Sequence, residues 1–363
     1  MHCVGFSISK DKKIILTFDF TKLVKLTDRY MPVISNWQQQ SRWREFHRQH
    51  PTLIEHTKPY KAPPDLVNKL IQEGVVVHDR EQTERIIYSH NYFRLKAYFI
   101  PFMVHGSSVF VPGTTFSAIY ELYQADQKIR DFLFPIIAEL EIRIRAVIDN
   151  EVTRTTNDPF WHLNPSNFKD YEQVKTVLNK AGQRFKAGKQ EFALHHLSRY
   201  YTARSFDYCR IPPFWVISEI FTFEQLNSVA KALDKTKFAV GNGNNKLHEC
   251  AIKFGFTSYD SLLTNLKCIQ ALRNIAAHHS RLWNRNLQAP NAVNKKVTIS
   301  PIQNNRLYSN LILLRVMCKS QNIPDGIAPF FSNLINVNPT LAAQMDSMGF
   351  PPHWETDPLW SST

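Results

Sequence analysis

The sequence predicts an all-α fold, a helical bundle with minor β decorations, and three observations support this prediction. Apolar residues recur at every third or fourth position over long stretches, which is the period of an amphipathic helix. Hydrophobic residues make up 43% of the 363-residue chain, enough to form a sizeable core. The loop signal from Gly241 to Asn245 separates two of the periodic stretches.

The first 55 residues differ in character from the rest of the chain. A β-like run from Lys13 to Phe20 gives way to a polar, aromatic and basic stretch from Gln38 to Glu45. We interpret residues 1–55 as an N-terminal extension of unknown role. Residues 56–330 are predicted to form the main domain, and residues 331–363 a C-terminal tail. The chain after Pro324 is expected to be loop-like.

Helix signals begin shortly after residue 58. Asp65 is placed to cap a first helix, which Gly74 ends. A second amphipathic run covers Glu81 to Leu95. The stretch from Phe110 to Thr115 predicts a turn with a short strand pair.

The longest periodic segment starts at Thr115 and runs through Val147. Its spacing of three and four residues predicts a long helix. Pro135 is expected to kink this helix or split it into two, because proline lacks the backbone N–H and clashes with the preceding turn. The apolar positions include Ile119, Leu122, Tyr123, Ile129, Phe132, Leu133, Ile136, Ile137, Leu140, Ile144 and Val147.

Three further helices are predicted in the second half of the chain. One follows Pro213 and runs through Phe223, one covers Ser258 to His279, and one covers Leu307 to Cys318. The region between Thr153 and Ile211 is rich in polar and aromatic residues and contains a loop at residues 157–162.

The net charge narrows the class of partner. Forty-four Lys and Arg residues against 31 Asp and Glu residues give a formal charge of +13 and a pI of about 9.5. Such a surplus attracts polyanions, so it favours nucleic acid first and an acidic membrane surface second. A merely basic soluble protein would have the same composition.

The cysteines and the apolar runs indicate the compartment. The five cysteines are scattered and show no C-x-x-C spacing, which argues against a disulfide framework or a zinc knuckle and for a reducing compartment. No stretch reaches the roughly 18 to 20 apolar residues that span a bilayer, and the run from Ile14 to Phe18 is too short for a signal peptide. The sequence therefore predicts a cytoplasmic protein without a membrane association.

The stretch from Leu272 to Arg285 carries the residues best suited to chemistry. A buried unpaired guanidinium costs several kcal/mol, so Arg273 must meet a carboxylate, another polar surface or a bound anion. Arg273 and His278 lie about 140° apart around a straight helix, whereas Asn274 and His278 share a face. Three arrangements could still direct Arg273 and His278 at the same atom: a bent helix, a helix that terminates between them, or a second copy of the motif across an interface. The apolar face on which Arg273 falls is formed by Leu262, Leu266, Ile269 and Ala276.

The order of residues in this stretch is specific. Arg273, Asn274 and His278 fit the pattern R-[N/D/H]-x-x-x-H, which resembles the signature of HEPN ribonucleases. The continuation from His279 to Arg285 is similar to the Abi-like family, the AbiD/AbiF type of abortive-infection proteins.

Other segments resemble the same family in the same order, over about residues 58 to 320. One departure is Glu224, where the family usually has glycine after Phe223; it affects a packing detail and leaves the chemical motif intact. The supporting segments are Lys58-Pro59, Asn91 to Tyr98, Leu140 to Arg145 and Pro213 to Glu219.

The resemblance implies a helical HEPN core, a homodimer that brings two motifs together, and RNA cleavage that needs no metal or other cofactor. Arg273, Asn274 and His278 would be the catalytic residues. The RNA 2′-OH is the nucleophile, histidine transfers protons and arginine binds the phosphate oxygens. It also implies a bacterial cytoplasmic, toxin-like protein of antiphage defence, regulated by a noncoding RNA or an antitoxin protein.

Neighbouring residues have weaker assignments. His279 is a possible supporting residue at the helix end, and the reverse assignment, with His279 as the acid or base, stays open. Glu141 and Arg143 are possible supporting residues, either as interhelical partners or as residues lining a cleft. Packing is at least as good an interpretation for Trp283 as RNA binding. The candidates for RNA binding, by phosphate contact and base stacking, are Arg281, Trp283 and Arg285.

Other reactive patterns are excluded by their spacing. The pairs around His195 and His248 lack the H-E-x-x-H order and a third metal ligand, so no metal site is predicted. The glycines at 241 and 243 lack the Lys-Ser/Thr of a phosphate-binding loop. Two alternatives to an endoribonuclease stay open: a non-catalytic RNA-binding HEPN scaffold, and a helical interaction protein without nucleic-acid function.

Overall fold

The computed structural model describes residues 4–8, 14–18, 37–241 and 244–361. It divides the chain into two compact units, residues 1–61 and residues 62–363. Helices dominate and the strands form two small pairs, so the predicted all-α fold with minor β decorations is confirmed. The functional divisions at residues 55 and 330 stay predictions.

The first unit contains an antiparallel strand pair and a helix. β1 (Val4–Ile8) pairs with β2 (Ile14–Phe18), with Val4 opposite Phe18 and Ile8 opposite Ile14. β2 lies inside the predicted β-like run. The polar stretch from Gln38 to Glu45, to which the sequence patterns assign no structure, lies in α2 (Trp37–Gln49). Its side chains from Arg42 onward are exposed.

The second unit holds the other helices, joined by loops and short 3₁₀ turns. In the part of the chain that the structure describes, none of its helices has the length and apolar character needed to cross a bilayer. In chain order, its elements are α3 (Pro63–Gln72), α4 (Arg80–His90), α5 (Tyr92–Lys96), α6 (Phe116–Thr156), α7 (Tyr171–Ala187), α8 (Glu191–Arg199), α9 (Phe214–Ile217), α10 (Phe223–Ala232), β3 (Ala239–Val240), β4 (Asn244–Asn245), α11 (Lys246–Lys253), α12 (Tyr259–Ala277), α13 (Leu307–Ser320), α14 (Ile327–Asn336), α15 (Pro339–Ala342) and α16 (Pro358–Ser361).

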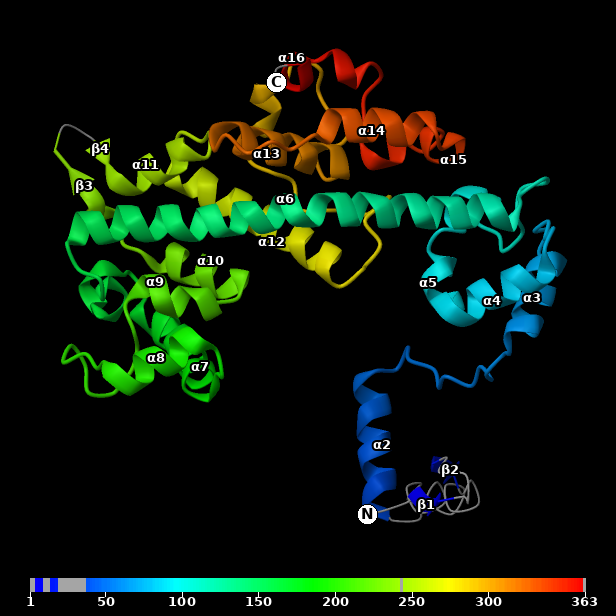
Figure 1. Cartoon of the computed structure of the whole chain (residues 1–363). Coiled ribbons are helices and arrows are strands. Elements are labelled where there is room, and N and C mark those ends of the chain that lie inside the picture. Colours follow the sequence, from blue (N-terminus) through cyan, green and yellow to red (C-terminus); the bar gives the residue numbers. More distant parts are fainter. Residues whose placement is uncertain (1–3, 9–13, 19–36, 242–243, 362–363) are drawn as a thin grey trace. The chain divides into compact units, whose positions relative to one another are not determined.

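The central element of this unit is α6, a 41-residue helix that contacts α9 to α13 and α15 (Figure 1). The Thr115 hydroxyl caps its first turn by accepting a hydrogen bond from the N–H of Ala118 at 3.1 Å. Asn157 ends it in the left-handed conformation, with a φ of 49°. Buried residues along its length make α6 the element on which the rest of the core is assembled.

Pro135 lies near the middle of α6 and does not divide it. Of the two outcomes expected for Pro135, the split into two helices is therefore wrong, and the kink stays a prediction. Proline in a helix interior costs about 3 kcal/mol. Buried apolar side chains flank it on both sides, including Leu133 and Ile137, and their packing keeps the two halves in one helix.

The helices α3 to α5 follow the prediction with two adjustments. α3 begins at Pro63, so Asp65 lies in its first turn rather than at the cap. The predicted run from Glu81 to Leu95 is interrupted at Asn91, which has a φ of 64° and separates α4 from α5. The predicted strand pair near residue 110 is reduced to two single bridges, Met103 with Phe110 and Val76 with Thr115.

The helix predicted after Pro213 is broken into two. α9 is only four residues long, and a 3₁₀ turn connects it to α10. A capping box starts α10: the Thr222 hydroxyl accepts from the N–H of Gln225 at 3.2 Å, and the Gln225 side chain accepts from the N–H of Thr222 at 3.0 Å. Glu224 is exposed in the first turn of α10, where a negative charge is favourable.

The chain after Pro324 is helical and packed, so the expectation of a loop-like tail is wrong. Prolines and polar residues suggest loops there, but aromatic side chains anchor the segment to α13. The Tyr308 and Phe350 rings lie 4.7 Å apart, and the indole N–H of Trp360 donates to the Tyr308 hydroxyl at 3.0 Å.

His162 is fully buried beside Trp161 and Phe214, in the segment between α6 and α7. Burial lowers the pKa of His162 from 6.5 to about 3, and an interaction with the backbone of Pro212 opposes only part of this shift. As the pH falls from about 6.5 towards 3, the unfolded chain therefore binds a proton that the folded chain does not. The fold should lose about 1.4 kcal/mol per pH unit over this window from this residue alone.

The variant His162→Gln tests this pH dependence because it removes the titrating group. We expect its free energy of unfolding, measured in urea from pH 7.5 to pH 4.5, to fall less steeply with decreasing pH than that of the parent protein. Equal slopes for the two proteins would contradict the assignment.

Candidate functional site

The end of α12 explains how the Arg/His motif is arranged. The helix starts at Tyr259, capped by the Ser258 hydroxyl, and its last helical residue is Ala277. His278 occupies the C-cap with φ −92° and ψ 10°, and His279 adopts the left-handed conformation with a φ of 51°. The helix therefore terminates between Asn274 and His278, and a second copy of the motif across an interface stays a prediction. Both histidine side chains are exposed.

Arg273 lies one turn before this helix end and is only partly buried, with 34% of its side chain exposed. Its Nε lies 3.5 Å from Oε2 of Glu141 on α6, and its Nη1 donates to Oδ1 of Asn274 at 3.4 Å. The prediction that this guanidinium must meet a polar partner is confirmed, and the partner is a carboxylate. Both contacts are long, so the guanidinium is oriented without being enclosed.

Glu141 belongs to a row of alternating charges that continues beyond Arg273. The Arg145 guanidinium lies 3.5 Å from Glu141 and 3.5 Å from Glu219. Glu141 and Arg145 are nearly buried, whereas Glu219 is half-exposed in the turn after α9. Arg273, Glu141, Arg145 and Glu219, referred to below as the charge network, come from three segments distant in sequence. It holds two positive and two negative groups.

Arg143 does not take part in the charge network. It pairs with Glu139 one turn earlier on α6, with an Nε to Oε1 distance of 2.7 Å, and both side chains are about half-exposed. The supporting role expected for Arg143 stays a prediction. Glu141 is the interhelical partner, because its position on α6 faces α12 whereas Arg143 faces solvent.

The chain after α12 is fixed by a buried carboxylate that the sequence analysis missed. The Asp126 side chain on α6 accepts hydrogen bonds from the N–H groups of Leu282 and Trp283, the latter at 2.6 Å, and from the Tyr98 hydroxyl at 2.5 Å. It also pairs with Arg130, and both charged groups are almost fully buried. A signal was present: Asp126 and Arg130 interrupt the apolar stripe of α6 at helical spacing, where a buried charge requires a partner.

The segment from Asn91 to Tyr98 also contacts the end of α12. Arg94 on α5 donates from Nη1 to the backbone carbonyl of His279. Arg281 donates in the other direction, from Nη1 to the carbonyl of Ala97 at 3.4 Å. These contacts hold the left-handed turn after α12 against α5, and they use backbone carbonyls, so the imidazole of His279 takes no part in them.

The three candidate RNA-binding residues have different environments. Trp283 is fully buried, and its ring stacks on Tyr98 with centroids 6.3 Å apart. A ring without exposed surface cannot stack on a base, so RNA binding is corrected to the packing alternative for this residue. Arg281 is partly buried, with its guanidinium 6.0 Å from the Trp283 ring, and Arg285 is exposed. Only the two arginines are accessible to a phosphate.

The described residues offer little support for a metal site or for a reactive cysteine. Within the described ranges, no group of three or more His, Cys, Asp or Glu side chains is arranged to hold a metal ion. Burial raises the pKa of the thiols of Cys250, Cys268 and Cys318 to about 12 each, so these thiols are protonated near neutral pH.

Together, these features define an all-α protein in which charged residues from three segments distant in sequence form the charge network, next to the C-terminal end of α12. The model of the Abi-like protein family matches residues 85–284, more than half of the chain. The chain therefore belongs to the Abi-like family. The match extends from α4 to the segment after α12, and it includes the whole charge network, Asp126 and the Arg/His motif. Comparisons with curated proteins and with solved structures find no match.

Proposed function

We propose that this protein is a metal-independent endoribonuclease of the HEPN type that acts in abortive-infection defence against phage. The supporting observation is the end of α12, where Arg273 is one-third exposed and His278 is exposed at the C-cap. Family membership supports the abortive-infection role, and the net charge of +13 suits a polyanionic substrate.

The proposed reaction uses the nucleophile that RNA itself carries. The 2′-OH gives up its proton and attacks the adjacent phosphorus, the P–O5′ bond breaks, and the 5′-oxygen takes up a proton. The products are a 2′,3′-cyclic phosphate and a 5′-OH. The protein has to supply proton transfer and stabilisation of the negative charge that develops on the phosphate oxygens.

The residues divide this work according to their chemistry. His278 transfers the proton, since histidine side chains ordinarily titrate near neutrality. Arg273 binds the phosphate oxygens with the planar guanidinium that suits bidentate contacts. Glu141 keeps that guanidinium extended from α12 at 3.5 Å, without enclosing it. Asn274, whose side chain is in contact with Arg273, orients the histidine or the phosphate.

A homodimer completes this proposal. Arg273 points from α12 towards Glu141 on α6, whereas His278 is exposed at the C-cap. Two copies of the motif, one from each protomer, would therefore surround one phosphate more fully than one copy does. Because an unrestrained nuclease would harm its own cell, we also propose a regulator, either a noncoding RNA or an antitoxin protein.

The alternative is a non-catalytic RNA-binding scaffold, and the basic composition favours it as much as it favours an enzyme. In that case the charge network and the Arg/His motif would stabilise the helix packing or the dimer, and RNA would be bound without being cut.

Purified protein incubated with end-labelled RNA in EDTA separates the two functions. We expect cleavage in EDTA, products ending in a 2′,3′-cyclic phosphate, and a dimer by light scattering at micromolar concentration. The variant His278→Ala, purified in parallel, controls for contaminating ribonuclease. Binding without cleavage would support the scaffold. Cleavage that EDTA stops and His278→Ala leaves intact would overturn the proposed mechanism.

A further inference from the structure

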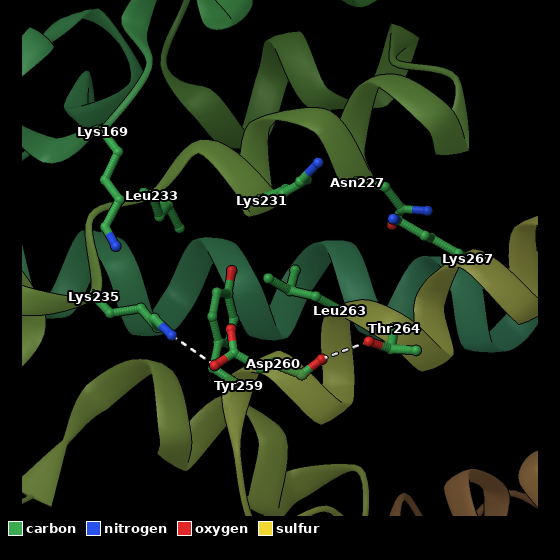
Figure 2. Close-up of a pocket in the computed structure, with 10 residues that line it drawn as sticks. All are labelled: Lys169, Asn227, Lys231, Leu233, Lys235, Tyr259, Asp260, Leu263, Thr264 and Lys267. Atoms are coloured by element: carbon green, nitrogen blue, oxygen red, sulfur yellow. Dashed lines mark hydrogen bonds and ion pairs between the residues drawn. The ribbon is translucent and has the colours of Figure 1, made fainter. Parts of the chain in front are cut away.

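Four lysines surround a cavity of about 310 Å³ beside the N-terminal half of α12 (Figure 2). They come from different segments: Lys169 precedes α7, Lys231 lies near the end of α10, Lys235 follows α10, and Lys267 lies on α12. Lys169, Lys231 and Lys267 are exposed, and Lys235 is partly buried. This group of residues is referred to below as the lysine pocket.

The lysine pocket carries an excess of positive charge. Among its lining residues Asp260 is the carboxylate, and it pairs with Lys235 at 2.6 Å, as the dashed line in Figure 2 marks. Hydrogen bonds from Thr236 lower the pKa of the Asp234 carboxyl, and the nearby charge of Lys169 adds to that shift. Lys231 and Lys267 are in no ion pair recorded among the described residues, so at least two ammonium groups face the pocket without a carboxylate partner. Such a site suits phosphate groups.

Hydrogen bonds between α10 and α12 form the base of the pocket. The Tyr259 ring is buried, and its hydroxyl donates to the carbonyl of Ala230 at 2.9 Å, which joins α12 to α10. Asn227 on α10 donates to the side chain of Gln270 on α12 at 2.7 Å. These two bonds fix the separation of the helices that carry Lys231 and Lys267, so the lysines are presented from a preformed surface.

One pocket lysine, Lys267, lies on the same face of α12 as the proposed catalytic histidine, His278. Lys267, Asn274 and His278 are separated by seven and then four residues, which returns each to nearly the same face at about 100° per residue. Each of the three is exposed or partly exposed. Lys267 and His278 are 11 positions apart, which corresponds to about 16 Å of helix, or roughly five stacked nucleotides at 3.4 Å each.

We propose that the lysine pocket binds backbone phosphates of the RNA strand whose scissile phosphate lies at Arg273 and His278. This inference rests on the proposed function, because it extends the substrate site of that reaction. RNA is favoured over a free nucleotide because Lys267, which lines the pocket, lies on the same side of α12 as Asn274 and His278. Lysines contact phosphates without reading bases, so the pocket contributes affinity and placement but no sequence preference.

RNA binding across salt concentrations tests this proposal. The background is His278→Ala, so that RNA is not consumed, and the pocket variant adds Lys231→Gln and Lys267→Gln. For a 12-nucleotide single strand we expect about tenfold weaker binding and a slope of log affinity against log salt that is shallower by about 1.4, the value for two lost phosphate contacts. Lys295→Gln with Lys296→Gln removes the same charge from exposed positions outside the pocket, and it should weaken binding by less than about twofold.

RNA length distinguishes a second contact from a general charge effect. With the pocket intact, lengthening the RNA from 4 to 12 nucleotides should raise affinity steeply, because only the longer strand spans both the pocket and the Arg273/His278 position. The pocket variant should lose most of this gain. The variant Lys231→Arg with Lys267→Arg should keep it. Equal losses for the pocket and control variants would overturn the proposal. So would saturable binding of AMP or inorganic phosphate in the pocket with no gain from RNA length. If the pocket variant loses the length-dependent gain and the parent protein never cleaves RNA, the proposed enzyme is refuted. The pocket then remains an RNA-binding site.

Discussion

Replacing His278 with alanine is expected to lower the rate of RNA cleavage by about 10²- to 10⁴-fold, the usual contribution of a general acid–base group. The imidazole is exposed at the end of α12 and forms no recorded hydrogen bond within the described residues, so its removal should leave the fold and RNA affinity nearly unchanged. Single-turnover cleavage of labelled RNA, together with a binding measurement, checks both expectations.

His279 provides a matched control, because it is the next residue, is also exposed and carries the same ring. The suitable variant is His279→Asn, since asparagine tolerates the left-handed conformation found there whereas alanine does so less well. We expect its rate to stay within a few-fold of the parent. If His279→Asn abolished cleavage and His278→Ala did not, the roles assigned to the two histidines would be reversed.

Mixing two inactive variants tests whether one site is formed by residues from both protomers. A heterodimer of Arg273→Ala and His278→Ala protomers keeps one arginine and one histidine. If the two protomers complete each other's site, mixing should restore part of the activity that each variant lacks. A site contained within one protomer would stay inactive after mixing.

The second large effect is expected for stability. Asp126→Ala should lower the free energy of unfolding by about 3 to 5 kcal/mol, because it leaves the Arg130 guanidinium buried without its carboxylate. It also removes the acceptor for the N–H groups of Leu282 and Trp283. Urea unfolding measures the loss, and RNA cleavage should fall with it, since the chain after the motif is no longer fixed to α6.

A control on the same helix isolates the effect of burial. Glu139 pairs with Arg143 at the same spacing of four residues, but both side chains are about half-exposed. Glu139→Ala should cost no more than about 0.5 kcal/mol, the usual size for exposed pairs of this kind. Similar losses for Glu139→Ala and Asp126→Ala would show that Asp126 does not have the anchoring role described here.

Local patterns predicted the helices well where the stretch of regularly spaced apolar residues was long. The run around α12 was placed within two residues at each end, and α6 was expected at the correct start. The break between α9 and α10 and the packed C-terminal segment were not predicted. The first depends on a capping box at Thr222, and the second on aromatic contacts of Phe350 with α13; local propensity contains neither.

The candidate site was predictable only in part, for a related reason. The Arg/His motif is continuous in sequence, and the need of Arg273 for a partner follows from electrostatics. The identity of that partner depends on the packing of α6 against α12, and the link from Arg145 to Glu219 depends on a third segment. Whether Trp283 faced solvent or the core was likewise decided by its neighbours, above all Tyr98.

The length of α6 has a mechanical consequence. Asp126, which fixes the backbone after the motif, and Glu141, which orients its arginine, stand on this one helix 15 residues apart, about 22 Å at 1.5 Å per residue. Pro135 lies between them. Any bending of α6 at that proline would therefore displace both attachment points relative to each other, and it would move Arg273 and the backbone after His278 at the same time.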